Sequence, residues 1–263
     1  MTDSSSRSQT NPGKKNIDPP LPFTMVQRRS PKNPVNSVRT VSDTKRSFYS
    51  LHTRPVNSIY RRVVEELMVE MHLLAVNTDF RYDPFYALGV VTTFDRFMQG
   101  YRPEADKDSI FNALCRSIES DPQQYRGDAQ RLVSAASQNA WDSVLIPEKS
   151  GEFRDTLSAI ASNPKFKYSR LFAVGLYTVI ETSSPETVKD AAKLTEALKQ
   201  ACQALNISED KAQKDLELYR SNLEKMTQVQ AVMADALAAD RKKREERAQA
   251  KAEVPKDEAT SES

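Results

Sequence analysis

Residues 55–101 read PVNSIYRRVVEELMVEMHLLAVNTDFRYDPFYALGVVTTFDRFMQGY. Apolar residues recur at steps of three and four on both sides of a short turn at 77–84, a period typical of amphipathic helices. The first helix is predicted to bury Val56, Ile59, Tyr60, Val63, Val64, Leu67, Met68, Met71 and Leu74. The second, at 84–99, is predicted to bury Phe85, Leu88, Val91, Phe94, Phe97 and Met98. Because ordering the backbone is costly, we expect both faces to pack against each other and against the rest of the chain.

Prolines, a polar cap and a glycine mark where these helices start and stop. Pro55 and Pro84 suit a first helical turn, because the N–H that proline lacks would have no partner there. Ser42 is a suitable N-cap for a short preceding helix, and Asp43 follows it where the helix dipole favours an acid. Gly100 suits the C′ position after the second helix. We therefore expect a short lead-in helix followed by a helical pair.

The composition is that of a helical protein with a basic N-terminal segment. The 263 residues include only 6 Gly, and no region shows strand-like alternation. Residues 1–39 carry seven basic and two acidic side chains, a charge of +5 against +2 for the whole chain, so the remainder carries −3. This segment is rich in Ser, Pro and Asn, and we expect it to be disordered. A transit peptide and an extension upstream of a start at Met25 are both open interpretations.

We predict an all-α fold. Residues 40–207 form a multi-helix globular domain, residues 208–249 a long coiled-coil-like helix, and residues 250–263 a disordered tail. The longest apolar run, Leu171 to Ile180, has about half of the ~20 residues that a membrane-spanning helix needs. It is therefore predicted to be a buried core helix, with no transmembrane segment. A single helix is expected from Pro185 to Leu205, and the two cysteines are expected to be buried and unpaired.

The C-terminal helix carries a regular apolar pattern. Ser208 is its expected N-cap. Beyond it, residues at alternating steps of four and three form a heptad face that consists of Ala212, Leu216, Tyr219, Leu223, Met226, Gln230, Met233 and Leu237. A helix over 209–249 would be ~60 Å long, against a radius of gyration of ~15–16 Å for the body. We expect its distal part to project, to pair with another helix or to self-associate, unless the face folds back on the body. The candidate partner-binding residues are Leu216, Tyr219, Leu223, Met226, Met233 and Leu237.

Polar residues near the ends of the second helix form another candidate site. Arg81, Asp83, Asp95, Arg96 and Tyr101 lie around the junction of the helical pair and at its far end. Two interpretations are open. They form buried or half-buried ion pairs that fix the helices, or they form a partner-binding surface.

The sequence offers no recognisable catalytic or metal site. It contains no Gly-rich phosphate loop, no G-x-S-x-G and no Cys/His cluster with ligand spacing. A di-iron site needs Glu-x-x-His on two helices, but Val69 stands where such a motif ending at His72 would need Glu, and no copy appears elsewhere. His72 is therefore interpreted as structural, and His52 as an incidental turn residue. Glu66 and Glu70 share a helix face, and their expected salt-bridge partners are Arg61 and Arg62. We therefore predict no enzymatic activity, no cofactor and no metal; an enzyme that uses Glu66, Glu70 and His72 is a minor alternative.

Several near-continuous segments carry a resemblance to a known family: RTVSDTKRSF (39–48), RPVNSIYRRVVEEL (54–67), DFRYDP (79–84), ALG (87–89) and FDRFMQGY (94–101). They resemble the thylakoid formation family of plants and cyanobacteria, which is also described as a photosystem II biogenesis factor. The resemblance is dense over about 38–125 and looser to about 240. It implies a role in thylakoid biogenesis and in photosystem II assembly and repair, with support of the membrane FtsH protease complex. It also implies a peripheral location at the thylakoid membrane, on its cytoplasmic or stromal side.

The leading hypothesis is therefore a non-enzymatic helical factor whose partners are FtsH and the photosystem II assembly machinery. The alternative is a nucleic-acid-associated protein or a generic coiled-coil adaptor. The basic N-terminal segment and the run Arg241 to Arg244 could contact phosphates or anionic lipid. Glutamates neighbour that run, and no recognition-helix motif accompanies it, so no nucleic-acid partner is expected.

Overall fold

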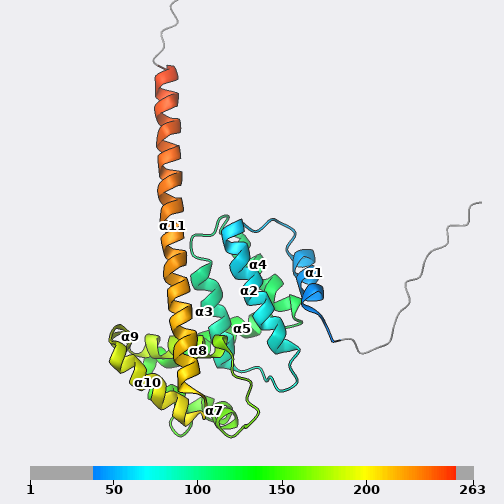
Figure 1. Ribbon diagram of the computed structural model, residues 1–263, viewed down its shortest axis with the longest axis vertical. Helices are drawn as coiled ribbons and strands as arrows, with labels where there is room; N and C mark the ends of the chain where they lie inside the picture. The colour runs from blue at the N-terminus through cyan, green and yellow to red at the C-terminus, as the bar shows by residue number, and fades with distance from the viewer. Residues whose placement is uncertain (1–37, 253–263) are drawn as a thin grey trace, which may run out of the picture. The chain divides into compact units, whose positions relative to one another are not determined.

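A computed structural model describes residues 38–252, and every regular element in this range is a helix (Figure 1). The elements are α1 (Val41–Leu51), α2 (Ser58–Ala75), α3 (Pro84–Phe97), α4 (Asp106–Ser117), α5 (Pro122–Gln138), α6 (Asp142–Leu145), the 3-10 helix η1 (Gly151–Phe153), α7 (Arg154–Ala161), α8 (Arg170–Ser183), α9 (Pro185–Lys189), α10 (Ala191–Ala204) and α11 (Glu209–Ala252). The predicted all-α fold with a long C-terminal helix is confirmed. The disorder predicted at both ends falls mainly on 1–37 and 253–263, which lie outside the described residues.

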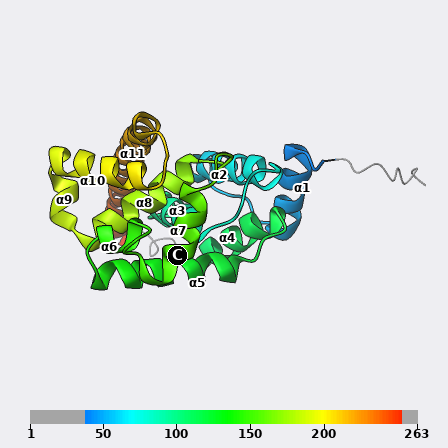
Figure 2. The same ribbon diagram turned by 90° about the horizontal axis from the view of Figure 1, so that it is seen from below.

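The core is built around α3 and α8. Figure 2 shows these two helices at the centre, with α5 along one side and α2 and α11 along the other. Two glycines allow their close approach. A Cβ added at Gly89 would lie 1.7 Å from the carbonyl oxygen of Leu171, and one added at Gly175 would lie 2.0 Å from that of Phe85. The two backbones are therefore in direct contact, and every residue from Leu171 to Ile180 is buried, as the sequence predicts.

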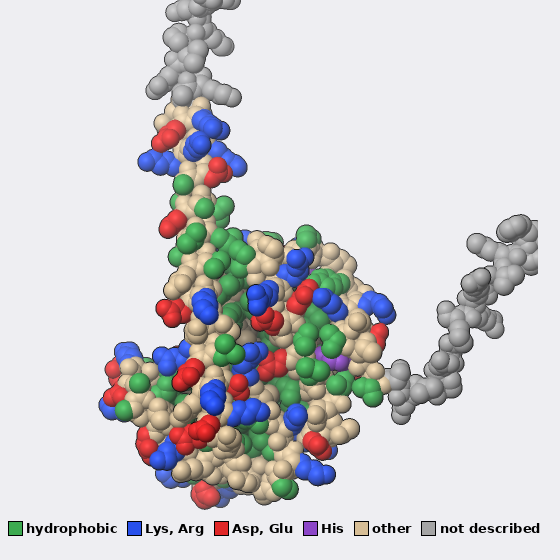
Figure 3. Space-filling view, viewed as in Figure 1, with side chains coloured by type: hydrophobic (Ala, Val, Ile, Leu, Met, Phe, Trp, Pro, Cys, Tyr) green, Lys and Arg blue, Asp and Glu red, His purple; other side chains and the backbone are tan. Residues whose placement is uncertain are grey.

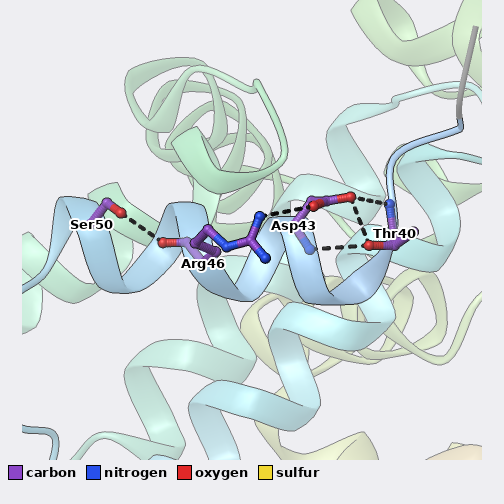
Figure 4. Close-up of polar contacts among 4 residues, drawn as sticks. All are labelled: Thr40, Asp43, Arg46 and Ser50. Atoms are coloured by element: carbon purple, nitrogen blue, oxygen red, sulfur yellow. Dashed lines mark hydrogen bonds and ion pairs between the residues drawn. The ribbon is translucent and has the colours of Figure 1, made fainter. Parts of the chain in front are cut away.

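The lead-in helix α1 begins two residues earlier than an N-cap at Ser42 would require. Thr40 is the N-cap, and its Oγ1 accepts a hydrogen bond of 3.2 Å from the backbone N–H of Asp43 (Figure 4). The Asp43 carboxylate in turn accepts from the Thr40 N–H at 3.1 Å, which completes a capping box. The prediction of Ser42 as N-cap is wrong, because only a residue three positions before Asp43 can form this reciprocal pair. Downstream in α1, Arg46 pairs with Asp43 and Ser50 donates to the Arg46 carbonyl.

Three other helix ends differ from expectation. The second helix starts at Ser58 rather than Pro55, because the Asn57 side chain caps it by accepting from the Ile59 N–H. Gly100 has a positive φ of 73°, which suits glycine, but it lies two residues past the C-cap of α3 rather than one. The single helix expected from Pro185 to Leu205 is two helices, because Asp190 interrupts it and caps α10.

The heptad face of α11 divides into two parts. Ala212, Leu216, Tyr219 and Met226 are buried against the body, where α11 packs on α8, α10 and α3. Ser208 caps the helix as predicted. Farther along, Val232 and Leu237 are each 68% exposed, and Figure 1 shows this distal part of α11 running clear of the other helices. The first half of this face therefore packs against the body, and the second half is exposed.

The described residues contain no helix with both the length and the apolar character needed to cross a membrane. The strongly apolar helices α3 and α8 have 14 residues each.

Candidate interaction surface

The residues suspected of chemistry have structural partners. His72 is buried, and its Nδ1 lies 2.8 Å from the Thr44 hydroxyl, so it ties α2 to α1. His52 is also buried, with Nδ1 2.9 Å from the Ser109 hydroxyl, which ties the end of α1 to α4. His52 as an incidental turn residue is therefore wrong. Burial lowers the pKa of both imidazoles, so the neutral forms are favoured. Among residues 38–252, no three His, Cys, Asp or Glu side chains are grouped so as to hold a metal.

The two glutamates on α2 pair with different helices. Glu66 accepts from Arg62 at 2.8 Å on the surface of α2, as predicted. Glu70 instead accepts from Arg170 at the start of α8, at 2.6 Å. Local sequence patterns could not predict this second pair, because its members are 100 residues apart. The pair fixes α2 to the central helix.

The polar residues near the ends of α3 do not form one site. Arg81 donates two hydrogen bonds of 2.8 Å to backbone carbonyls of its own loop, those of Thr78 and Phe80. Asp83 is buried and caps α3, and Tyr101 is buried with its ring edge-on to Tyr60. Because Asp83 and Tyr101 are buried, neither belongs to an accessible partner surface. Burial also raises the pKa of Asp83 to about 7, although two backbone N–H groups oppose that shift.

The remaining two residues of that set make ion pairs between helices. Asp95 accepts from Arg126 of α5 at 2.7 Å, and Arg96 pairs with Glu181 of α8. The interpretation of half-buried ion pairs that fix the helices therefore describes both. The structure confirms ion pairs between helices for Asp95 and Arg96. A partner contact at these two residues stays a prediction.

The main open feature is a groove between α2 and α11, here called the α2–α11 groove. Its floor is formed by α3 and α8, including Phe97 and Val174, and it deepens beside them into a cavity of about 430 Å³. Its two walls include Glu66, Val69, Glu70 and Leu73 of α2 and Leu218, Asn222 and Val229 of α11. Figure 3 shows hydrophobic side chains on this face, with charged ones among them. Sequence reasoning missed the groove because the walls are about 150 residues apart along the chain.

A family model described as thylakoid formation protein matches residues 40–248. The chain belongs to the thylakoid formation protein family. The match reaches slightly beyond the resemblance seen in the sequence, and it includes α1 through most of α11. Both walls and the floor of the α2–α11 groove therefore lie in the part of the chain that defines membership of the thylakoid formation protein family.

Individual relatives in the thylakoid formation protein family support the assignment. Protein Thf1 of Nostoc punctiforme is 62% identical over 222 residues, which cover 82% of this chain and 94% of that protein. Protein Thf1 of Trichormus variabilis is 63% identical over 219 residues, which cover 81% and 94%. A solved structure of Psb29 is 46% identical, with a TM-score of 0.70 over 78% of this chain and 98% of that one. The all-helical architecture is thus shared with a solved relative.

The two cysteines are not activated for reaction, and the charged run of α11 is partly neutralised. Cys115 and Cys202 are buried and unpaired, as predicted, and burial raises the pKa of their thiols to about 12 and about 11. In the charged run of α11, Arg241 pairs with Glu245 and Arg244 pairs with Asp240, each at 3.0 Å. Part of the positive charge that could contact nucleic-acid phosphates is therefore neutralised within the helix.

Proposed function

We propose that this protein is a non-enzymatic factor for thylakoid membrane biogenesis and for photosystem II assembly and repair. In this proposal it acts by binding and supporting the membrane FtsH protease complex. The observation that carries the proposal is the match to the thylakoid formation protein family over residues 40–248, together with 62% identity to a relative covered almost from end to end.

The proposed mechanism is docking by the open half of α11. The helical body acts as the scaffold, because its core encloses α3 and α8 and holds the first half of α11 in place. Exposed apolar residues continue on the distal half, where Val232 and Leu237 are each 68% exposed. An exposed apolar helix face is a common element of helix–helix recognition between proteins. We place FtsH on this face.

The proposed location is peripheral, at the cytoplasmic or stromal side of the thylakoid membrane. Attachment there would come from contacts with FtsH and with the photosystem II assembly machinery. Washing isolated thylakoids with high salt or alkaline buffer should release the protein without dissolving the membrane. Retention after both washes would contradict peripheral attachment.

The docking mechanism is tested by recovery of FtsH from thylakoids with a tagged full-length chain and with a chain that ends at Gln230. A chain that ends at Ile207, just before α11, is unsuitable because it would also lack Leu216, Tyr219 and Met226, which are buried in the body. Ending at Gln230 keeps these, and it keeps the hydrogen bond from Gln230 to the Gln99 carbonyl.

We expect FtsH with the full-length chain and a large loss with the shortened one. Equal recovery with both chains would overturn docking through the distal part of α11. No recovery with the full-length chain would overturn FtsH as the partner.

A further inference from the structure

We propose that the α2–α11 groove binds an amphipathic helix of a partner protein, and that the polar side chains of this helix are acidic. The inference builds on the proposed docking role but concerns a second surface, which is separate from the distal part of α11. It rests on the shape of the groove, on the apolar residues along it and on the charges at its rims.

The groove is long enough for a partner helix. One end lies between Ile59 of α2 and Val229 of α11, and the other between Leu73 and Lys211, so the two walls are antiparallel. The α11 wall from 211 to 229 is ~27 Å long at ~1.5 Å per residue. A partner helix of ~17 residues would fill that length. Binding of one amphipathic helix between two others is an established form of peptide recognition.

Apolar residues are concentrated along this groove. Nine large hydrophobic side chains are exposed among the described residues, and four of them line it: Val69 (37%), Leu73 (56%), Leu218 (48%) and Val229 (41%). Below them the floor is apolar at Phe97 and Val174. The floor also presents the Thr93 hydroxyl, a buried group without a hydrogen-bond partner within residues 38–252. The groove can thus receive an apolar helix face and one polar group.

The charges at the rims select an acidic partner. The four acids that line the groove each have a partner within the chain: Glu65 pairs with Lys45, Glu66 with Arg62 and Glu70 with Arg170, and Asp215 accepts from the Tyr168 hydroxyl at 2.9 Å.

Three lining cations have no ion pair. Arg61 of α2 and both Lys211 and Lys225 of α11 make none within 4.0 Å in the described part of the chain, and Lys211 lies over the Tyr168 ring. The surplus charge at the groove is therefore positive. The distal α11 of a second copy is a poor match, because its run from Arg241 to Arg247 holds five basic and two acidic residues.

The test places a photo-reactive amino acid, p-benzoylphenylalanine, in the groove of the full-length chain in cyanobacterial cells. One variant is Leu73→p-benzoylphenylalanine and another is Leu218→p-benzoylphenylalanine. The matched control is Leu51→p-benzoylphenylalanine, since Leu51 is an exposed leucine of α1 that does not line the groove. After irradiation, the tagged chain is purified under denaturing conditions and the cross-linked peptide is mapped by mass spectrometry.

We expect both groove positions, but not the control, to cross-link to one segment with apolar residues at helical spacing and an excess of Asp and Glu. Adding Arg61→Glu and Lys225→Glu should lower the yield by at least about threefold, since two exposed charge pairs are lost. Cross-links to lipid, to a second copy of this chain or to a basic segment would overturn the proposal, as would a yield no higher than that of the control.

Measuring FtsH recovery in the same cells separates this proposal from the proposed function. Groove cross-links that fail while the full-length chain still recovers FtsH would overturn the groove proposal alone. Groove cross-links to an acidic helix without any FtsH recovery would overturn FtsH as the partner and leave the groove assignment intact.

Discussion

The helix pairs α3–α8 and α2–α11 differ in how close their backbones come. In α3–α8, Gly89 and Gly175 leave no room for even a methyl group between the two helices. Between α2 and α11, the facing positions hold long polar side chains such as Arg62 and Lys225, and a groove remains. The α3–α8 pair thus buries its apolar surface within the fold, whereas the α2–α11 pair leaves apolar surface exposed to a partner. Stability should depend on the closed pair and binding on the open one.

The largest expected effect comes from forcing the closed pair apart. Gly89→Ala places a Cβ within 1.7 Å of the Leu171 carbonyl oxygen, so α3 and α8 must separate. We expect the free energy of unfolding to fall by at least about 3 kcal/mol, as in overpacked cores. Urea denaturation followed by circular dichroism measures it. Gly127→Ala in α5 is the control, because nothing lies within 4 Å of its added Cβ, and it should stabilise by roughly 0.5–1 kcal/mol. Equal effects of the two changes would contradict the close packing.

The next effect concerns Asp83, the buried cap of α3. Its pKa is raised to about 7 in the fold, above the value near 3.8 of an exposed aspartate. Between about pH 4 and about pH 7 the folded protein therefore binds more protons than the unfolded chain, and this group makes stability fall as pH rises. Asp83→Asn keeps a capping side chain but cannot ionise. Its stability relative to the unmodified protein should rise by roughly 2–4 kcal/mol from about pH 4.5 to about pH 8.

Comparing the two proteins at each pH removes the contributions of His52 and His72. Their lowered pKa values act in the opposite direction, because stability from neutral histidine is lost as pH falls. A stability difference between Asp83→Asn and the unmodified protein that does not change with pH would contradict the raised pKa.

A smaller effect is expected at the floor of the open pair. Arg170→Met removes the partner of Glu70, whose side chain is only 19% exposed, so we expect a loss of about 1–2 kcal/mol. Arg62→Met is the matched control, because both members of its pair with Glu66 are more than half exposed, and it should cost less than about 0.5 kcal/mol. Urea denaturation of both variants tests the difference. A loss for Arg62→Met as large as that for Arg170→Met would show that the Glu70 pair has no special structural role.

The smallest effect on stability is expected from the chain that ends at Gln230. All the buried residues of α11 remain in it, and residues 231–247, which it lacks, are exposed or half-buried. The free energy of unfolding should change by less than about 0.5 kcal/mol. A larger loss would mean that the distal part of α11 helps to hold the fold.

Local patterns were sufficient to predict most of the helices. The periodic apolar residues of α2 and α3 are buried or half-buried as expected, and the buried run in α8 was evident from its uniform apolarity. Errors at helix ends had signals in the sequence. Thr40 stands three residues before Asp43, and Asp190 immediately precedes a run suited to a helix start. Ser42 has a capping propensity similar to that of Thr40, and the helix start at Ser184 is correct but the helix ends at Lys189.

The candidate surface was harder to predict because it depends on tertiary packing. The heptad pattern of α11 identified which face is apolar, but not that the body covers Leu216 and leaves Leu237 exposed. The Glu70–Arg170 pair joins residues 100 positions apart, and the groove exists only because α3 and α8 separate its walls. Apolar periodicity therefore predicts which face of a helix is buried, but not which helix or partner covers it.

The most direct test of the account is the recovery of photosystem II activity after strong light in cyanobacterial cells whose own copy of the gene is deleted. Cells receive either the full-length chain or the chain that ends at Gln230, both at equal abundance. We predict that the full-length chain restores the recovery rate and that the shortened chain, although folded, does not. Equal recovery with the two chains would contradict the claim that the exposed half of α11 carries the function.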